Sequence, residues 1–388
     1  MHAEVLSVLE QEKSEVINLL FDAFQGSASK SFFASYINKV PHKKYIVVKD
    51  KGKCVGVLCV LDRNINLKGV SVKVTWMSYM AVDMSYKSFK ITSLLKESLF
   101  KYSKENSVLT IGIARKALDW YWYPYGFLGA SNFSEIHLDC KEVPAGSTGY
   151  NVRPLEYSDN LRSQLCELYN TTYLKLSGCV QRDESIWDYY YTEKIEKNST
   201  ELRFVLKNSK IVGYFVFEKN RILEIAADKE VIKNFPEIVN DYFVNHYESI
   251  DTLIYEVGLS HPIKKWLANY THKVNQRYVW SGGHIVKLES IAPLLEILLP
   301  ILNKRLKDCR VGPFKLNISN VEFCYNKDEL SFEQISNQED HINNKDWIKI
   351  LFGNIDFETI ESVNKKDRSL LKLMFDNLHF QVPYLDQM

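Results

Sequence analysis

The chain has 388 residues, of which 46% are apolar and 13% aromatic, so it can bury large cores and is too long for one ordinary domain. Its 49 basic and 48 acidic residues nearly cancel, and neither half carries a basic block, which argues against a nucleic-acid backbone as the main partner. The composition predicts a globular protein of two or three domains with a small ligand.

The cysteines and the apolar segments set further limits. Seven cysteines are scattered without a Cys-x-x-Cys pair, so we expect reduced structural thiols and no metal site. Residues 1–15 lack the basic start and apolar core of a signal peptide, and the longest apolar stretch, 291–302, is interrupted by Pro293 and Pro300. We therefore expect a cytoplasmic protein that does not enter a membrane.

Residues 1–145 alternate helix and strand patterns in the order of one compact α/β domain. The expected helices cover residues 16–24, 32–40, 91–102 and 116–123, and the expected strands cover residues 44–48, 55–61, 70–82 and 109–114. A small, turn-rich segment at Pro144–Gly149 follows and predicts a linker.

The most informative junction in this region joins the long strand to the helix, at residues 80–96. Apolar residues alternate from Val70 to Val82, and from Ile91 they follow the spacing of one helical face. A strand that leads straight into a helix directs several unpaired backbone N–H groups and the positive end of the helix dipole at one point. The junction predicts an anion site of the kind that binds phosphates.

Two lysines in the junction strengthen this prediction. Lys87 and Lys90 lie in the turn and the first helical residues, where a cation opposes the helix dipole by about 0.3–1 kcal/mol. A bound anion would reverse that penalty. The alternative interpretation is that both are solvated surface lysines.

Residues 150–282 repeat a similar order and are interpreted as a diverged copy of the first region. The expected helices cover residues 161–174, 183–195, 232–245 and 262–270, and the expected strands cover residues 202–206, 211–217 and 252–257. The strand after Ile222 leads to Ala226–Glu230, which contains no glycine and only one lysine. We therefore expect a scaffold copy that lacks the anion site.

Residues 284–388 form a third pattern, a small α+β domain. The expected strands cover residues 285–288, 314–318 and 321–325, and the expected helices cover residues 291–306, 347–352, 357–363 and 369–378. The tail stays apolar as far as Met388, whereas chain ends usually fray in polar sequence, so we expect it to dock.

Two of these elements resemble the GCN5-related N-acetyltransferases (GNAT). The strand, turn and helix at residues 80–96 are similar to that family's Val-x-x-x-x-Arg-x-x-Gly-x-Gly/Ala turn, which wraps the pyrophosphate of acetyl-CoA. Residues Trp122–Phe127 are similar to its Tyr-x-x-x-Gly-Phe element. The resemblance implies acetyl-CoA as co-substrate and no metal.

The order of the three regions resembles the Eis-type (enhanced intracellular survival) acetyltransferases. The closing patterns Leu351–Gly353, Leu373–Phe375 and Pro383–Asp386 support this resemblance. It implies an α/β (α+β) fold with tandem acetyltransferase domains, at residues 1–145 and 150–282, followed by a small α+β sterol-carrier-protein-like domain at residues 284–388. The second acetyltransferase domain is degenerate, and the C-terminus docks.

The resemblance also assigns the cofactor contacts. Val82 matches the opening valine, Lys87 stands where arginine is usual, and Lys90 and Thr92 replace the two glycines. A glycine lets the backbone approach phosphate closely, whereas the Cβ of Lys90 crowds the pocket. The implied contacts are Met80, Ala81 and Val82 to the pantetheine arm, and Lys87, Ser88, Phe89, Lys90, Ile91 and Thr92 to the pyrophosphate.

The family's general acid is a tyrosine four residues before the glycine, and counting back from Gly126 gives Trp122. An indole N–H cannot protonate a thiolate, so the role is either lost or passed to a neighbour, Tyr121 or Tyr123. We prefer Tyr123 because it adjoins Pro124, which ends the helix. Trp76, Trp122 and Tyr125 are assigned to the substrate pocket; the alternative is that these aromatic residues only fill the core.

The general base of Eis-type enzymes is the chain's own C-terminal carboxylate, reaching into the first domain, which here belongs to Met388. A terminal carboxylate has a reference pKa of about 3.3–3.7 and needs partial burial to act as a base. It could instead only orient the acceptor's ammonium group. His379 and Asp386 are alternative bases.

The resemblance implies transfer of an acetyl group from acetyl-CoA to a primary amine of a small molecule, by direct attack in a ternary complex. Aminoglycosides, amino sugars and polyamines present such an amine, and so does a lysine side chain. The rival hypothesis is a catalytically impaired relic that acts as a binding or regulatory protein. A longer acyl donor and a lipid ligand of the third region stay open, and a homo-oligomer is expected because relatives with this domain order commonly assemble.

Overall fold

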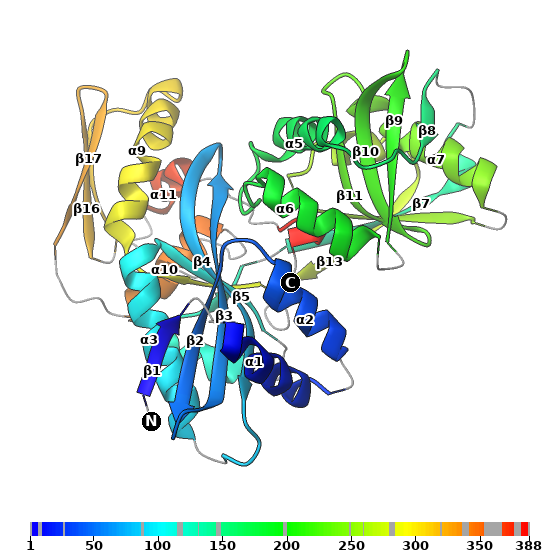
Figure 1. The fold of residues 1–388 in the computed structure, drawn as a ribbon. Helices are drawn as coiled ribbons and strands as arrows, with labels where there is room; N and C mark the ends of the chain where they lie inside the picture. The colour runs from blue at the N-terminus through cyan, green and yellow to red at the C-terminus, as the bar shows by residue number, and fades with distance from the viewer. Residues whose placement is uncertain are drawn as a thin grey trace. The chain divides into compact units, whose positions relative to one another are not determined.

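The chain passes between two units, each built on its own seven-stranded sheet (Figure 1). The first unit comprises residues 1–64, 72–130 and 280–378, and the second comprises residues 65–71, 131–279 and 379–388. This computed structural model describes residues 2–6, 10–25, 28–86, 89–114, 119–130, 132–144, 149–196, 200–247, 250–258, 260–278, 284–318, 320–335, 341–352, 367–375 and 382–386.

The sheet of the first unit has the strand order β1-β2-β3-β4-β5-β14-β6. Its strands are β1 (His2–Leu6), β2 (Lys43–Asp50), β3 (Lys53–Leu67), β4 (Val70–Val82), β5 (Leu109–Ile113), β6 (Leu128–Gly129) and β14 (His284–Leu288). The helices are α1 (Glu10–Ala23), α2 (Lys30–Lys39), α3 (Phe89–Asn106) and α4 (Asp119–Trp122), which a 3₁₀ turn at Tyr123–Tyr125 extends. Mixed pairing and helices between strands confirm the predicted α/β (α+β) fold class.

Helix α3 packs unusually close to the sheet because a glycine faces it. Ile91, Leu95 and Leu99 are fully buried in a core with β2 and β3, and each such side chain contributes roughly 1.5–3 kcal/mol on burial. A Cβ on Gly56 of β3 would lie 2.5 Å from Cγ2 of Ile91. A residue with a side chain at position 56 would therefore push the first turn of α3 away from the sheet.

The sheet of the second unit has the strand order β13-β7-β12-β11-β10-β9-β8. Its strands are β7 (Asn132–Asp139), β8 (Asn151–Arg153), β9 (Glu201–Lys207), β10 (Lys210–Glu218), β11 (Arg221–Ala227), β12 (Thr252–Gly258) and β13 (His272–Tyr278). The helices are α5 (Asp159–Tyr173), α6 (Glu184–Tyr189) with a π-helical turn at Tyr190–Ile195, α7 (Phe235–His246) after a 3₁₀ turn at Ile232–Asn234, and α8 (Lys264–Leu267).

The two sheets share one strand order once two strands are exchanged. β7 belongs to the first predicted region in sequence but lies between β12 and β13 of the second sheet, while β14 follows the second region and lies between β5 and β6 of the first sheet. These strands cross the boundaries predicted near residues 145 and 284, and the division into three consecutive domains stays a prediction. A single sequence does not select the partner sheet, because the pattern of a strand gives its own faces and not the distant segment with which it pairs.

One hydrogen bond and one glycine occupy equivalent positions in the two sheets. The N–H of Asp83 donates to the carbonyl of Val55, and the N–H of Asp228 donates to the carbonyl of Val212, each at 2.9 Å. A glycine follows each of these valines. A Cβ on Gly213 would lie 2.9 Å from the ring of Phe235 on α7, just as a Cβ on Gly56 would contact Ile91 on α3. These correspondences support the interpretation that the two regions are diverged copies.

The third region contributes β14 and a separate layer to the first unit. Helix α9 (Ile291–Asp308) lies beside the three-stranded sheet of β15 (Phe314–Ile318), β16 (Val321–Asn326) and β17 (Glu329–Gln334) (Figure 1). α10 (His341–Phe352) and α11 (Arg368–Met374) close a core in which Phe323, Trp347 and Phe375 meet. The helix expected at residues 357–363 lies outside the described residues.

Candidate active site

The first unit opens where β4 and β5 part. These parallel strands pair at Val74–Leu109, Thr75–Thr110 and Trp76–Ile111 and form no pair beyond Trp76 among the described residues. β4 continues to Val82, and within the described part of the chain no side chain bonds to the main chain of Met80–Val82. Met80 and Val82 are half-buried and Ala81 is 3% exposed, and an extended ligand would pair with this main chain in place of β5.

The turn that follows β4 is fixed by the hairpin between β2 and β3. Nζ of Lys53 lies 2.8 Å from Oδ2 of Asp83, and the hydroxyl of Tyr86 donates to Asp50 at 2.9 Å. Oδ1 of Asp83 accepts from the N–H and the hydroxyl of Ser85. Lys53 first and then Ser85 lower the pKa of Asp83 to about 2, so the carboxylate stays charged and paired in the turn.

The N-terminus of α3 carries the remaining predicted cofactor contacts. The side chain of Ile91 lies in the core, so only its main chain can face a ligand. Phe89 is 80% exposed, Lys90 is exposed, and the hydroxyl of Thr92 donates to the carbonyl of Phe89. Lys87 and Ser88 lie outside the described residues. The first turn contains no acidic residue, which keeps the positive end of the helix dipole uncompensated by the helix itself.

The aromatic element after β5 divides between the core and the surface. Trp122 is 6% exposed and packs against Tyr121 and Phe127 in the core beneath α3. Tyr123 is 54% exposed, with Nζ of Lys345 at 3.5 Å from the centre of its ring. The hydroxyl of Tyr125 lies 2.6 Å from Nζ of Lys96.

Lys96 is an unexpected member of this cluster. It lies on the inner face of α3, is 5% exposed, and its ammonium sits over the rings of Tyr121 and Tyr125 at 4.2 and 4.0 Å. Cation–π contacts and the phenol oxygen replace the water that this cation loses on burial. Lys96 lies beside the apolar stripe predicted from Ile91, Leu95 and Leu99 and not within it, so the sequence pattern gave no sign that it is buried.

Trp76 and Trp122 are not brought together, although both were assigned to the substrate pocket. Successive side chains of a strand point to opposite faces, and Met77 shares the core that contains Trp122. Trp76 therefore lies on the face away from α3. It is 1% exposed, and its indole N–H has no hydrogen-bond partner among the described residues.

His284 is a candidate that the sequence analysis missed. It pairs with Ile113, two residues beyond the last β4–β5 pair, and its ring meets that of Trp76 edge-on with 5.8 Å between the centroids. β14 thus brings a titratable side chain, 2% exposed, to the level at which the strands part. Its distance along the chain from β4 and β5 concealed this position.

In the second unit, β11 and β12 diverge as β4 and β5 do in the first, but side chains of the same unit bind the main chain of β11 at this point. β11 and β12 pair at Arg221–Ile254 and Ile222–Tyr255, and the next main-chain groups of β11 are occupied. The N–H groups of Ile225 and Ala227 donate to the hydroxyls of Tyr173 and Thr172, and the ring of His261 bonds the carbonyl of Ile225 at 3.2 Å. These contacts support the expectation that this copy serves as a scaffold.

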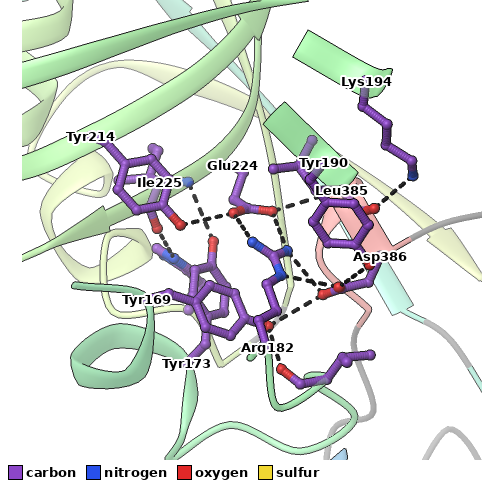
Figure 2. A network of polar contacts seen from close by, with 12 residues as sticks. Tyr169, Tyr173, Arg182, Tyr190, Lys194, Tyr214, Glu224, Ile225, Leu385 and Asp386 are labelled. Carbon is purple, nitrogen blue, oxygen red and sulfur yellow. Dashed lines mark hydrogen bonds and ion pairs between the residues drawn. The ribbon is translucent and has the colours of Figure 1, made fainter. Parts of the chain in front are cut away.

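The C-terminal tail docks on the second unit (Figure 2). Asp386 is 2% exposed, and both its carboxylate oxygens accept hydrogen bonds from buried partners that include Arg182. This engagement leaves Asp386 unsuited to the role of a catalytic base. His379 and Met388 lie outside the described residues.

Among the described residues, no helix is long and apolar enough to cross a membrane, and no group of three or more His, Cys, Asp and Glu side chains could hold a metal ion. All seven cysteines are described, and none forms a disulfide.

Comparisons with known proteins identify the fold. The sequence model of a family described as acetyltransferase (GNAT) domain matches residues 4–127, whereas comparison with curated proteins gave no match. A GCN5-related N-acetyltransferase from Anabaena variabilis is similar over 100% of both chains, with a TM-score of 0.73 and 12% identity. A probable N-acyltransferase from Enterococcus faecalis is similar over 99% of this chain and 98% of its own, with a TM-score of 0.70 and 12% identity.

Eis1 from Mycobacterium abscessus is similar over 100% of both chains, with a TM-score of 0.68 and 12% identity. At these identities the likeness to solved structures shows the fold, and the sequence match gives the family of the N-terminal region. The first unit therefore contains an acetyltransferase (GNAT) domain at residues 4–127, within a fold that the whole chain shares with these proteins.

Proposed function

We propose that this protein is an N-acetyltransferase that moves the acetyl group of acetyl-CoA to a primary amine of a small molecule. The observation that carries the proposal is the opening between β4 and β5, in the unit whose sequence matches the acetyltransferase family. The equivalent opening of the second unit is sealed, so catalysis belongs to the first. Aminoglycosides, amino sugars and polyamines are the acceptor classes proposed.

Acetyl-CoA would bind through main chain and charge. The pantetheine amides pair with Met80, Ala81 and Val82 along the free edge of β4, and the pyrophosphate meets the N–H groups that begin α3. Lys87 and Lys90 add positive charge at this point. Ile91 contributes only its N–H, because its side chain is buried against Gly56.

The chemistry needs one base and one acid. The deprotonated amine attacks the thioester carbonyl carbon, the C–N bond forms, the C–S bond breaks, and the thiolate of CoA takes a proton. We assign the acid to Tyr123, with Tyr121 as the alternative, and the base to the terminal carboxylate of Met388. His284 supports this scheme as a relay for the amine's proton, since it lies level with the opening on the face away from α3.

Four further statements belong to the proposal. The second unit is a degenerate acetyltransferase copy that serves as scaffold. The third region is a sterol-carrier-protein-like domain, for which the sheet of β15, β16 and β17 beside α9 is the support. The protein acts in the cytoplasm, and it assembles as a homo-oligomer.

The test is release of free CoA thiol from acetyl-CoA in the presence of a panel of amines from the three classes. We expect turnover with at least one class. Deleting Met388, or adding one glycine after it, moves the terminal carboxylate by about 3.5 Å. Either change should reduce kcat by about 10²-fold or more while acetyl-CoA affinity stays within twofold. Acetyl-CoA binding without turnover on any amine would instead support a catalytically impaired relic.

A further inference from the structure

Asp386, the last described residue of the tail, lies with the buried Arg182 and Glu224 and the half-buried Lys194 in a cluster of charged side chains in the second unit (Figure 2). Nε and Nη2 of Arg182 donate to Asp386 at 3.0 and 2.9 Å. The hydroxyl of Tyr190 donates to the same carboxylate at 2.7 Å, whereas that of Tyr169 lies 3.2 Å from it and donates its one proton to the carbonyl of Val180 at 2.9 Å. Asp386 therefore accepts two hydrogen bonds from Arg182 and one from Tyr190, an arrangement that fits a charged carboxylate.

The receptor for this carboxylate is held in place without the tail. Glu224 of β11 binds the other edge of the Arg182 guanidinium at 2.7 and 2.8 Å and accepts a further bond from Tyr214 at 2.9 Å. The guanidinium also lies over the rings of Tyr169 and Trp187, at 4.0 and 4.8 Å. These contacts fix the two N–H groups that face Asp386 before the tail arrives.

The charges of the cluster favour an anion at this place. The Arg182 guanidinium lies between the carboxylates of Glu224 and Asp386, and all three side chains are fully buried. Lys194, which is half-buried, adds a cation whose Nζ donates to the carbonyl of Leu385 at 2.6 Å. Breaking the pair of Arg182 and Asp386 is unfavourable, because it removes a buried partner of a charged group.

The position of the cluster corresponds to the opening of the first unit. Glu224 lies two residues beyond Ile222, the last residue of β11 that pairs with β12, and the 3₁₀ turn at Tyr384–Asp386 lies against β11. The tail thus contacts β11 just beyond the residues of β11 that pair with β12.

We propose that the second unit is a receptor for the C-terminal segment of the chain, in which Arg182 recognises the carboxylate of Asp386, and that Asp386 is a positioning residue for the terminal carboxylate two residues further on. The positioning role rests on the proposed function. The receptor role does not, because it needs no catalysis.

Hydrogen exchange of the full-length chain tests the receptor role. Asp386→Asn removes the negative charge but keeps the shape of the side chain, so we expect amide exchange in residues 379–388 to accelerate by tenfold or more. Asp251→Asn is the matched control, since Asp251 belongs to the same unit and forms an exposed ion pair with Lys141. Unchanged exchange of the tail in Asp386→Asn would overturn the proposal.

Binding in trans gives a second test that does not depend on the stability of one variant. A fluorescent synthetic peptide of residues 379–388 is titrated onto the chain shortened at Leu378, whose folding is checked by its circular dichroism. We expect saturable binding, weakened about 10²-fold by Asn in place of Asp386 in the peptide. Equal affinity of the two peptides would contradict recognition of the carboxylate.

Turnover separates the positioning role from the proposed function. We expect Asp386→Asn to lower kcat by tenfold or more with little change in the KM for acetyl-CoA, and the trans peptide to restore turnover to the shortened chain. A released tail with unchanged kcat would overturn the positioning role. Wild-type chain without turnover on any amine would overturn the proposed function, while the exchange and peptide results would still decide the receptor role.

Discussion

At the scale of single residues, equivalent positions of the two copies have taken different roles. Asp83 ends β4 with its carboxylate exposed to Lys53 and Ser85, and these partners lower its pKa. Asp228 directly follows β11. Burial is the main influence on its pKa and raises it. Asp83 accepts hydrogen bonds that fix the turn before the basic N-terminus of α3. Asp228 lies in the second unit, where side chains occupy the corresponding strand edge.

The charge of the turn gives the first prediction. Lys87→Glu together with Lys90→Glu places two negative charges where a pyrophosphate would bind, so the Kd for acetyl-CoA should rise by tenfold or more. Calorimetric titration measures this change. Lys101→Glu, an exposed position on the same helix, should leave the Kd within twofold. A rise in the Kd from Lys101→Glu that is half the double variant's on a logarithmic scale would mean that only net charge matters and that the turn is no phosphate site.

His284 gives the second prediction. An imidazole has one ring nitrogen that donates a proton and one that accepts it, and this one lies beside Trp76 at the level where β4 and β5 part. His284→Gln should lower kcat by about 10²-fold, because the relay is lost. The affinity for acetyl-CoA should stay within twofold, since the side chain lies on the face away from α3. An unchanged kcat would exclude His284 from proton transfer.

At the scale of elements, the close approach of α3 to β3 positions the helix start. Gly56→Ala should destabilise the protein by about 1–3 kcal/mol, because its Cβ would meet Ile91 at 2.5 Å in a packed core. Urea unfolding measures the difference. Gly312→Ala is the matched control, with nothing within 4 Å of its Cβ, and should change stability by less than about 0.5 kcal/mol.

Most elements were predictable from the sequence because their apolar spacing is strong. The long strand is β4 and the helix from Ile91 belongs to α3, whose start at Phe89 is two residues earlier. β1 and β17 were missed because each is short; β17 alternates polar and apolar residues, but only Leu330 and Phe332 are apolar. The helix predicted at residues 262–270 is only the short α8, and the helix predicted at 183–195 changes to a π-helical turn after Tyr189.

The site was less predictable than the fold, because it depends on pairing between distant strands. The turn at residues 80–96 was visible in the sequence, since strand and helix are adjacent there. The residues that lie next to this turn and to the strand opening were not visible. Lys53 comes from a hairpin, His284 from an exchanged strand, and Lys96 from the inner face of α3. A predicted pocket that joined Trp76 to Trp122 ignored the alternation of side chains across β4.

At the scale of the whole molecule, one copy has an open strand edge and the other has closed around its own tail. His261 is part of that closure: its ring is 3% exposed, bonds the carbonyl of Ile225 and accepts from the N–H of Ile263. Burial lowers its pKa to about 4. The folded second unit therefore holds this imidazole neutral at pH values where the unfolded chain protonates it.

This difference predicts how stability depends on pH. As the pH falls from about 6.5 to about 4, the unfolded chain takes up a proton at His261 before the folded chain does, so the second unit loses up to about 1.4 kcal/mol per pH unit. Urea unfolding at pH 7, 5.5 and 4.5 measures this loss. In His261→Gln that contribution should disappear, whereas His284→Gln, in the other unit, should leave the pH dependence of the second unit unchanged.

The central claim is that the open copy binds acetyl-CoA through its pyrophosphate. Isothermal titration of the full-length chain with acetyl-CoA, and with adenosine as the control lacking the pyrophosphate, tests it most directly. We predict saturable binding of acetyl-CoA with a stoichiometry of one per chain, because the second copy is sealed, and at least 10²-fold weaker binding of adenosine. Absence of binding at millimolar acetyl-CoA, or a stoichiometry of two, would contradict the account.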